Sequence, residues 1–173
     1  MVWEVITQDA EYASDYARLV IGGRFPEGEA AMAQDPVWAF YYARDVIKKL
    51  EGKNRWPAGE AAIAQDARYA YLYARDVIEG EFPEGEAAIA QDLDRAYEYA
   101  RDVIKKLEGK NRWPAGEAAI AQDALYAYRY ARDVIGGRWP EPHRDTAEAN
   151  IKQEADLWED YVELVKQSGS DAD

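Results

Sequence analysis

Apolar residues recur along the chain at helical spacing, in a stripe that is written four times. In its first full copy the stripe comprises positions 39, 42, 43, 46 and 47, and this spacing places all five on one face of an α-helix. The four copies are Ala39, Tyr42, Ala43, Val46 and Ile47; Ala70, Tyr73, Ala74, Val77 and Ile78; Ala96, Tyr99, Ala100, Val103 and Ile104; and Ala127, Tyr130, Ala131, Val134 and Ile135. We expect this stripe to be core, with alanines that let neighbouring helices approach closely.

A shorter helix is predicted before each copy of the stripe. Pro26 suits the first position of a helix, and Glu27 and Glu29 place negative charge at the positive end of its dipole. Asp35 is then a good N-cap for the longer helix, which we expect to end at glycine. Each unit therefore predicts a helical hairpin. One apolar residue of each short helix should face the same interior: Met32, Ile63, Ile89 and Ile120.

The dipeptide Gln-Asp marks the period of the repeat. It occurs at 8–9, 34–35, 65–66, 91–92 and 122–123, with successive spacings of 26, 31, 26 and 31 residues. The true duplicated unit is thus a 57-residue pair of hairpins, and residues 43–67 return unchanged at 100–124. A short fixed period is typical of stacked arrays. The pattern predicts an all-α fold, a right-handed α-solenoid of stacked hairpins with alternating 26- and 31-residue repeats.

We expect one repeat domain over residues 1–167. Residues 1–24 should form an N-terminal cap with one longer helix from residue 3, and residues 25–140 the repeated body. Residues 141–167 should form an acidic C-terminal cap, followed by a disordered tail at 168–173.

The pattern DPxxAxxYARDVI…GRFPEGEAA resembles short αα-hairpin arrays in predicted proteins of bacteria and bacteriophages, within the broad class of tetratricopeptide-like solenoids. The resemblance covers about residues 8–140. It implies stacked hairpins and brings no activity with it. These hairpins are shorter than a tetratricopeptide unit, so no groove residues carry over. The identical blocks fit either a recent natural duplication or an engineered consensus, and slightly favour the latter.

Composition excludes several kinds of chemistry. There is no cysteine and only one histidine, which excludes a thiolate nucleophile and a multi-histidine metal centre, and we expect no cofactor or metal. No apolar run approaches the length of a membrane span, and no signal peptide is evident at Met1, so we expect a cytoplasmic protein and no membrane partner. The net charge is −13, and residues 141–173, with ten acids and three bases, carry more than half of it. This distribution favours a solubilising end cap over an extended acidic surface.

Two recurring features have both a functional and a structural interpretation. Adjacent arginine and aspartate residues recur as Arg44-Asp45, Arg75-Asp76, Arg101-Asp102 and Arg132-Asp133. Because neighbouring side chains on a helix diverge by about 100°, we expect these pairs not to face each other and not to be catalytic. An aromatic residue precedes a proline in five loops, at Phe25, Trp56, Phe82, Trp113 and Trp139. We expect these rings to be buried against the adjacent hairpin rather than to contact a ligand.

The basic segments 48–55 and 105–112 each lead to a helix N-terminus, where an anion could bind. Glu51 and Glu108 interrupt them, and the net charge of the chain would repel nucleic acid. We therefore expect no nucleic-acid partner.

The two 57-residue copies differ mainly on the outer side of the longer helices. A possible partner-binding face there comprises Val37, Trp38, Tyr41, Tyr69, Leu72, Leu125 and Tyr126. This set is more apolar than solubility requires. Packing between hairpins, especially at the mostly aromatic position of Trp38, is an equally good interpretation.

These observations favour a non-enzymatic helical-repeat scaffold or a protein- or peptide-binding module, monomeric or weakly oligomeric. The alternative is an acidic viral decoy that mimics nucleic acid and inhibits a DNA-binding enzyme. An enzyme is disfavoured because the sequence offers no nucleophile–base pair.

Overall fold

The computed structural model describes residues 2–52 and 54–169, and these residues form an all-α fold without a β-strand. Internal contacts divide the chain into two compact units, residues 1–89 and 90–173. Unit 1 contains α1 (Val2–Gln8), α2 (Ala10–Asp15), α3 (Pro26–Met32), α4 (Pro36–Tyr42), α5 (Lys49–Glu51), α6 (Pro57–Ile63), α7 (Ala67–Tyr73) and α8 (Pro83–Ile89). Unit 2 contains α9 (Leu93–Asp102), α10 (Pro114–Ile120), α11 (Ala124–Tyr130), α12 (Arg144–Ile151) and α13 (Ala155–Gln167). The all-α prediction is confirmed, and one continuous domain over 1–167 stays a prediction.

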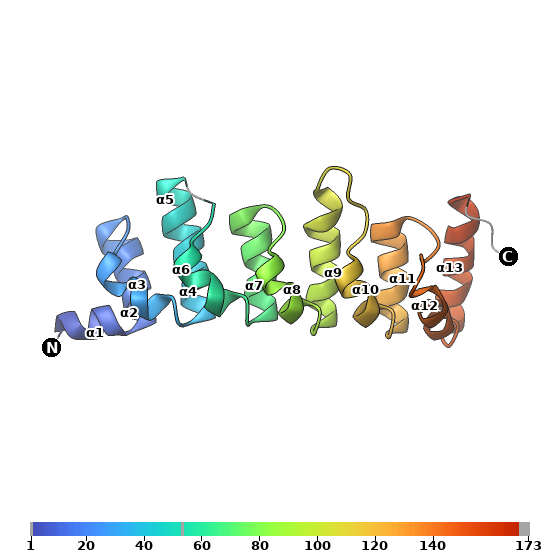
Figure 1. Ribbon diagram of the computed structural model, residues 1–173, viewed down its shortest axis with the longest axis horizontal. Coiled ribbons are helices and arrows are strands. Elements are labelled where there is room, and N and C mark those ends of the chain that lie inside the picture. Colours follow the sequence, from blue (N-terminus) through green and yellow to red (C-terminus); the bar gives the residue numbers. More distant parts are fainter. Residues whose placement is uncertain (1, 53, 170–173) are drawn as a thin grey trace. The chain divides into compact units, whose positions relative to one another are not determined.

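Within each unit the longer helices lie next to one another, α4 beside α7 and α11 beside both α9 and α13 (Figure 1). Each longer helix packs chiefly against the short helix that follows it in sequence, as α4 does on α6 and α7 on α8. The tightest pairs are therefore a long helix and the next short one, whereas the sequence pattern grouped each short helix with the long one after it.

The predicted N-cap residues start the longer helices. The Asp35 carboxylate accepts hydrogen bonds from the backbone N–H groups of Val37 and Trp38 at 2.8 and 3.2 Å. Asp9, Asp66, Asp92 and Asp123 cap their helices in the same way. These bonds satisfy N–H groups that have no partner within the helix, which fixes each helix start.

Most of the longer helices finish in a π-helical turn, at residues 16–21, 43–48, 74–78 and 131–135. The residue after such a turn has left-handed backbone at Gly22 and Gly136, where glycine costs least. After the turn at 74–78 this place is taken by Glu79, with a φ of 59°. The Glu79 carboxylate accepts a hydrogen bond from Lys48 Nζ at 2.7 Å. The predicted glycine stop at Gly80 is therefore one residue late.

The predicted core stripe is buried. Its alanines, tyrosines and valines are at most 4% exposed in all four copies, and Met32, Ile63, Ile89 and Ile120 of the short helices are fully buried beside them. Ile47 and Ile104 are buried as well, whereas Ile78 and Ile135 are half-buried. The helical spacing thus identified the interior correctly.

A hydrogen-bonded group of four residues, here called the tyrosine network, connects the start of a short helix to the longer helix after it. It comprises the side chains of an arginine, a glutamate and a tyrosine and the backbone N–H of the aromatic residue before the proline. The Tyr130 hydroxyl accepts a hydrogen bond from the backbone N–H of Trp113 at 2.7 Å and donates one to Glu117 at 2.9 Å. Arg112 then donates two hydrogen bonds to the Glu117 carboxylate, at 2.8 and 2.6 Å. The same four roles recur in the sets Arg24, Phe25, Glu29, Tyr42; Arg55, Trp56, Glu60, Tyr73; and Arg138, Trp139, Glu148, Tyr161.

The aromatic residues before proline are buried contacts between neighbouring helices, as predicted. All five are at most 4% exposed. The Trp56 ring meets the ring of Tyr42 edge-on, with centroids 4.9 Å apart, and covers Gly59, where a Cβ would lie 2.4 Å from the indole. That Cβ would also lie 3.0 Å from the Cβ of Ala39 on α4. Glycine is therefore required for the close approach of α6 to α4.

Two predictions about the ends are wrong. Residues 3–24 do not form one long helix: α1 ends at Gln8, and a new helix starts because the Asp9 carboxylate accepts a hydrogen bond from Tyr12 N–H at 3.0 Å. At the other end, Ser168 and Gly169 form a helix-ending turn instead of a disordered tail. The Ser168 N–H bonds to the Leu164 carbonyl at 3.0 Å, and its hydroxyl bonds to the Val165 carbonyl at 2.8 Å. The rest of the predicted tail, 170–173, lies outside the described residues.

The tyrosine network predicts a large effect of removing one buried hydroxyl. Tyr130→Phe leaves the Trp113 N–H and the fully buried Glu117 each short of a partner, and should lower the free energy of unfolding by about 2–3 kcal/mol. Tyr126→Phe removes a hydroxyl from a partly exposed site and should cost no more than about 1 kcal/mol. Urea denaturation of both variants measures the difference, and equal costs would contradict the structural role of the network.

The two buried indoles without partners give a second prediction. Among the described residues, the N–H groups of Trp56 and Trp113 have no hydrogen-bond partner, whereas that of Trp139 donates to the Ala127 carbonyl at 2.8 Å. Trp113→Phe should therefore be milder than Trp139→Phe by about 1 kcal/mol, since both lose the same ring volume and only the second loses a hydrogen bond. The denaturation midpoints of the two variants test this order of stability losses, provided that the free energy of unfolding depends equally steeply on denaturant in both. A larger loss in Trp113→Phe than in Trp139→Phe would refute the prediction.

A third prediction concerns alkaline pH. Burial is the main reason why the pKa values of Tyr42, Tyr73, Tyr130 and Tyr161 lie above the usual 10. Tyrosines of the unfolded chain ionise first as the pH rises through about 10, so the stabilisation is complete below that pH and is lost above it. The free energy of unfolding should fall above pH 10, and less steeply in Tyr130→Phe than in the parent chain. If the free energy of unfolding fell equally steeply with pH in both proteins, Tyr130 would be excluded as a cause of the loss of stability.

Candidate functional site

A pocket of about 390 Å³ opens on the surface of unit 1. Its lining residues are Ser14 and Asp15 of α2, Arg18 of the following π-helical turn, and Trp38 and Tyr41 of α4. The pocket therefore lies at the first junction between longer helices, and its volume is at the small end of the range of ligand sites.

A single missing ring explains why this junction is hollow. At the junction of α4 and α7, the rings of Phe40 and Tyr69 meet with centroids 5.8 Å apart. Tyr97 and Tyr126 make the same contact in unit 2, at 6.1 Å. By the repeat period, Ser14 stands where the later copies have Phe40, Tyr71, Tyr97 and Tyr128. Trp38, which corresponds to Tyr69, consequently has no ring from α2 to pack against.

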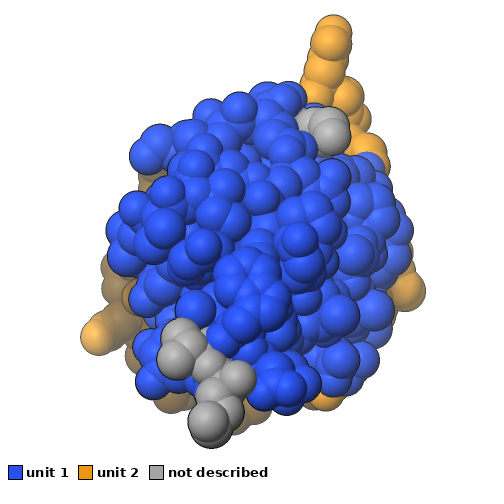
Figure 2. All heavy atoms as spheres, turned by 90° about the vertical axis from the view of Figure 1, so that its left-hand side faces the viewer, with its two compact units in different colours: residues 1–89 blue, residues 90–173 orange. Residues whose placement is uncertain are grey.

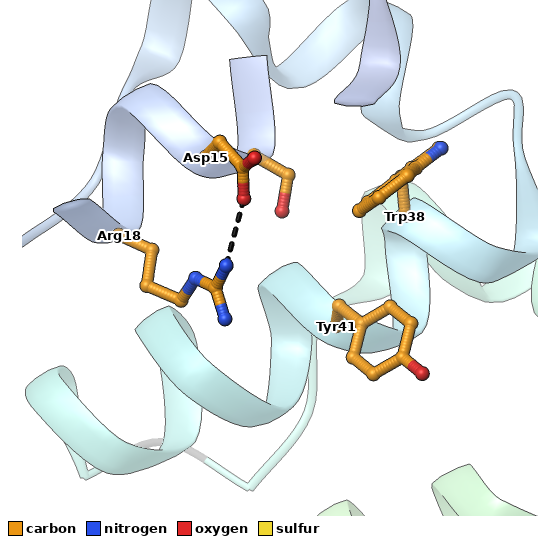
Figure 3. Close-up of a pocket in the computed structure, with 5 residues that line it drawn as sticks. Asp15, Arg18, Trp38 and Tyr41 are labelled. Atoms are coloured by element: carbon orange, nitrogen blue, oxygen red, sulfur yellow. Dashed lines mark hydrogen bonds and ion pairs between the residues drawn. The ribbon is translucent and has the colours of Figure 1, made fainter. Parts of the chain in front are cut away.

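The walls of the pocket differ in chemistry (Figure 3). On one side Arg18 Nη2 and Asp15 Oδ1 form an ion pair at 2.8 Å, with both side chains nearly half exposed. On the other side lie the rings of Trp38 and Tyr41, with centroids 5.9 Å apart and planes tilted by 48°. Ser14 is buried, with 4% of its surface exposed. The pocket thus combines an aromatic wall with a charged pair that can hydrogen-bond to a polar substituent.

Arg18 belongs to this site because of a second local substitution. In the later copies the corresponding arginine pairs with the aspartate that follows it, but here Leu19 follows. Arg18 therefore bonds to Asp15, three residues earlier on the helix, and lies beside the pocket. Two changes in the first copy, at Ser14 and Leu19, create the pocket and its charged rim.

The seven residues of the predicted partner face separate into different environments. Trp38 and Tyr41 line the pocket. Tyr69 packs on Phe40, and Tyr126 packs on Tyr97 and donates to Asp94, a bond that with burial raises the pKa of Tyr126 to about 12. These two tyrosines therefore make ring contacts between neighbouring longer helices. Val37 and Leu72 are half-buried, and Leu125 is exposed. Two of the seven residues lie in unit 2, Leu125 and Tyr126, and the other five lie in unit 1.

Sequence reasoning missed Ser14, Asp15 and Arg18. The available signal was the comparison of Ser14 with its four aromatic counterparts, because a serine at an otherwise aromatic position indicates lost volume. Ser14 lies before the two 57-residue copies, at 34–90 and 91–147, so a comparison of those copies does not include it.

The prediction that adjacent arginine and aspartate side chains do not meet is wrong. Arg44 donates two hydrogen bonds to Asp45, at 2.7 and 2.8 Å, and the other three pairs form the same bidentate contact. Each guanidinium also lies over the ring four residues earlier, as Arg44 does over Phe40 at 5.2 Å. The long arginine side chain bends back over this ring, which overcomes the angular separation of the two Cβ atoms.

Four of the described basic side chains in the two loop segments make internal contacts: Lys48, Arg55, Lys105 and Arg112. Lys48 bonds to the Asp76 carbonyl and to Glu79, each at 2.7 Å, and Lys105 bonds to the Asp133 carbonyl. Arg55 and Arg112 belong to tyrosine networks. Residue 53 of the first segment lies outside the described part of the chain. These contacts weigh against an anion site there.

The described residues contain neither a candidate metal site nor a candidate membrane-spanning helix. No group of three or more histidine, cysteine, aspartate or glutamate side chains in that part of the chain is arranged to hold a metal ion. Likewise, none of the helices in ranges 2–52 and 54–169 is both long and apolar enough to cross a membrane.

Comparisons with known proteins place the chain in no family. The sequence matches no protein-family model, and neither curated proteins nor solved structures gave a significant match. The function is therefore inferred from the residues and their geometry.

Proposed function

We propose that this chain is a non-enzymatic binding module built as a right-handed α-solenoid, and that the pocket at its first junction accepts an aromatic side chain of a protein or peptide partner. The observation that carries the proposal is Ser14. It stands where four later copies have a ring, and it leaves Trp38 and Tyr41 facing a vacant volume. A ring from a partner restores the contact that the chain itself makes at other junctions.

The repeat architecture of the proposal rests on the alternating 26- and 31-residue period and on the recurrence of the tyrosine network. Both features give successive segments the same internal bonds and the same aromatic contacts. A stack of such segments gains its stability from contacts between neighbours.

The chemistry of the pocket narrows the kind of partner. An aromatic ring over Trp38 and Tyr41 gains edge or offset stacking, and a hydroxyl on that ring lies near the Asp15–Arg18 pair. The chain carries 34 acidic and 21 basic residues, so a basic residue next to the aromatic one is favoured over an acidic one. The expected ligand is thus a segment with tyrosine and a neighbouring lysine or arginine.

The alternative of a nucleic-acid mimic receives less support. Many acids of the body are already neutralised, since Glu29, Glu60 and Glu117 belong to tyrosine networks with arginine and the recurring aspartates pair with the arginines before them. A decoy needs a row of unpaired negative charge to imitate phosphates. We therefore do not propose that the chain mimics nucleic acid.

Filling the pocket tests the proposal. p-Cresol has the ring and the hydroxyl of a tyrosine side chain. It should shift the amide NMR signals of residues 14–18 and 38–41 of the parent chain, with a dissociation constant of about 1–10 mM. Ser14→Tyr supplies the missing ring, so it should abolish these shifts and raise the free energy of unfolding by about 0.5–1.5 kcal/mol.

Ser14→Ala is the matched control, because it removes the hydroxyl and keeps the pocket open, and it should bind p-cresol like the parent chain. A Lys-Tyr dipeptide amide should bind more tightly than its Glu-Tyr counterpart. Undiminished shifts in Ser14→Tyr, or no shifts in the parent chain at saturating p-cresol, would refute the proposal.

A further inference from the structure

One end of unit 1 carries a concentration of exposed apolar side chains. Of the eight large hydrophobic residues that are exposed within the described chain, six belong to its first 21 residues. Leu19 and Val20 are the most exposed, at 70% and 67%, and Trp3, Tyr12 and Ile21 are between 44% and 56% exposed. These five residues are called the N-terminal face. Figure 2 views unit 1 from the side on which α1 lies in Figure 1.

The residues of the N-terminal face are neighbours. Tyr12, Tyr16 and Val20 follow one another at four-residue intervals, which places them along one side of the helix. The Trp3 ring meets the Tyr16 ring edge-on, with centroids 5.9 Å apart. Leu19 and Ile21 flank Val20 in the same π-helical turn. The five residues thus lie on α1, α2 and the turn after it.

The corresponding positions elsewhere in the chain are covered by the preceding repeat. Val20 corresponds to Val46, Val77, Val134 and Val165, all of which are at most 2% exposed. Val165 is informative because it lies on α13, the last described helix, where its covering neighbours are α11, α12 and the turn at 131–135. A valine at this position is therefore buried from the N-terminal side. Val20 is exposed because no repeat packs there within unit 1.

Leu19 makes this face more apolar than its counterparts. Four later copies have an aspartate at this position, Asp45, Asp76, Asp102 and Asp133, and the last has Leu164. The aspartates also face the preceding repeat, since Asp133 accepts a hydrogen bond from Tyr97 and the Asp76 carbonyl accepts one from Lys48. The first copy thus has an exposed leucine where four later copies have an aspartate. Such a patch is typical of an interaction site.

The side chains at the two ends of the chain indicate which surface can cover the N-terminal face. A head-to-tail stack would bring the free side of α13 onto the N-terminal face, and α13 exposes Asp156, Glu159, Asp160 and Glu163. Covering leucine and valine with these carboxylates would remove charge from water without a partner. The N-terminal face of a second copy is apolar instead, and the nearby charges of Arg18 and Asp15 already neutralise each other. A twofold axis brings two such faces together.

We infer that two copies of this chain associate through their N-terminal faces in a symmetric dimer. The contact buries Leu19, Val20 and Trp3 of both copies, and so supplies from a second molecule the covering that a preceding repeat supplies at Val46 and Val77. Neither Leu19 nor Val20 lines the pocket. Because Leu19 determines the partner of Arg18, Val20→Glu is the variant that tests this association apart from ligand binding in the pocket.

Sedimentation equilibrium from about 1 µM to about 1 mM tests the inference. The parent chain should show a reversible monomer–dimer equilibrium. Leu19→Asp introduces the residue that four of the other copies have, and Val20→Glu, a separate variant, places a charge at the neighbouring position. Each should weaken dimerisation by at least about tenfold, because two apolar side chains lose their burial per dimer.

Leu125→Arg is the matched control, because Leu125 is also exposed and its counterpart in the repeat is Arg68. It should leave the dimerisation constant unchanged. Circular dichroism should be the same for all variants, since each altered side chain is exposed in the monomer. A parent chain that stays monomeric at the highest concentration, a dimer that Leu19→Asp does not weaken, or growth into larger polymers by head-to-tail stacking would each overturn the inference.

Discussion

The rest of the structure depends on a buried hydroxyl that joins two helices. In each tyrosine network the phenol of the longer helix accepts the backbone N–H just before a proline and donates to a glutamate one turn into the short helix. That N–H would otherwise be buried without a partner, and the carboxylate would be a charge removed from water. Arginine completes the group by neutralising the glutamate. The aromatic ring beside the proline is thereby held against the preceding tyrosine, which sets the position of the next helix.

Much of this fold could be predicted from the sequence, because its signals are periodic and local. The N-cap role of Asp35 and the burial of Trp56 follow from one-dimensional patterns. The helical stripe predicts the tyrosines only as core residues that fill space. Their hydrogen bonds span 17 or 22 residues and depend on the angle between helices, which a helical stripe does not contain. The arginine–aspartate pairs were misjudged because a helical wheel represents arginine by a fixed direction, whereas its side chain bends over an aromatic ring.

The candidate site illustrates a different limit. No motif points to Ser14, and its meaning appears only when the ring contact between Phe40 and Tyr69 is known. The exposed Leu19 likewise looks unremarkable until Asp133 is seen to bond across a junction. Both residues are departures from a repeat in its first copy. In such a chain, function is best sought where one copy lacks a contact that the other copies make.

The short span of the tyrosine network also bears on how the chain folds. Trp56 and Tyr73, or Trp113 and Tyr130, are 17 residues apart, so each network closes a small loop at low entropic cost. Contacts that are local in sequence favour rapid folding, and stacked repeats can begin to fold at any of several places. Every network is a possible nucleus, and a truncated or growing chain can complete one as soon as its tyrosine is present. Folding in the order of synthesis follows naturally from this arrangement.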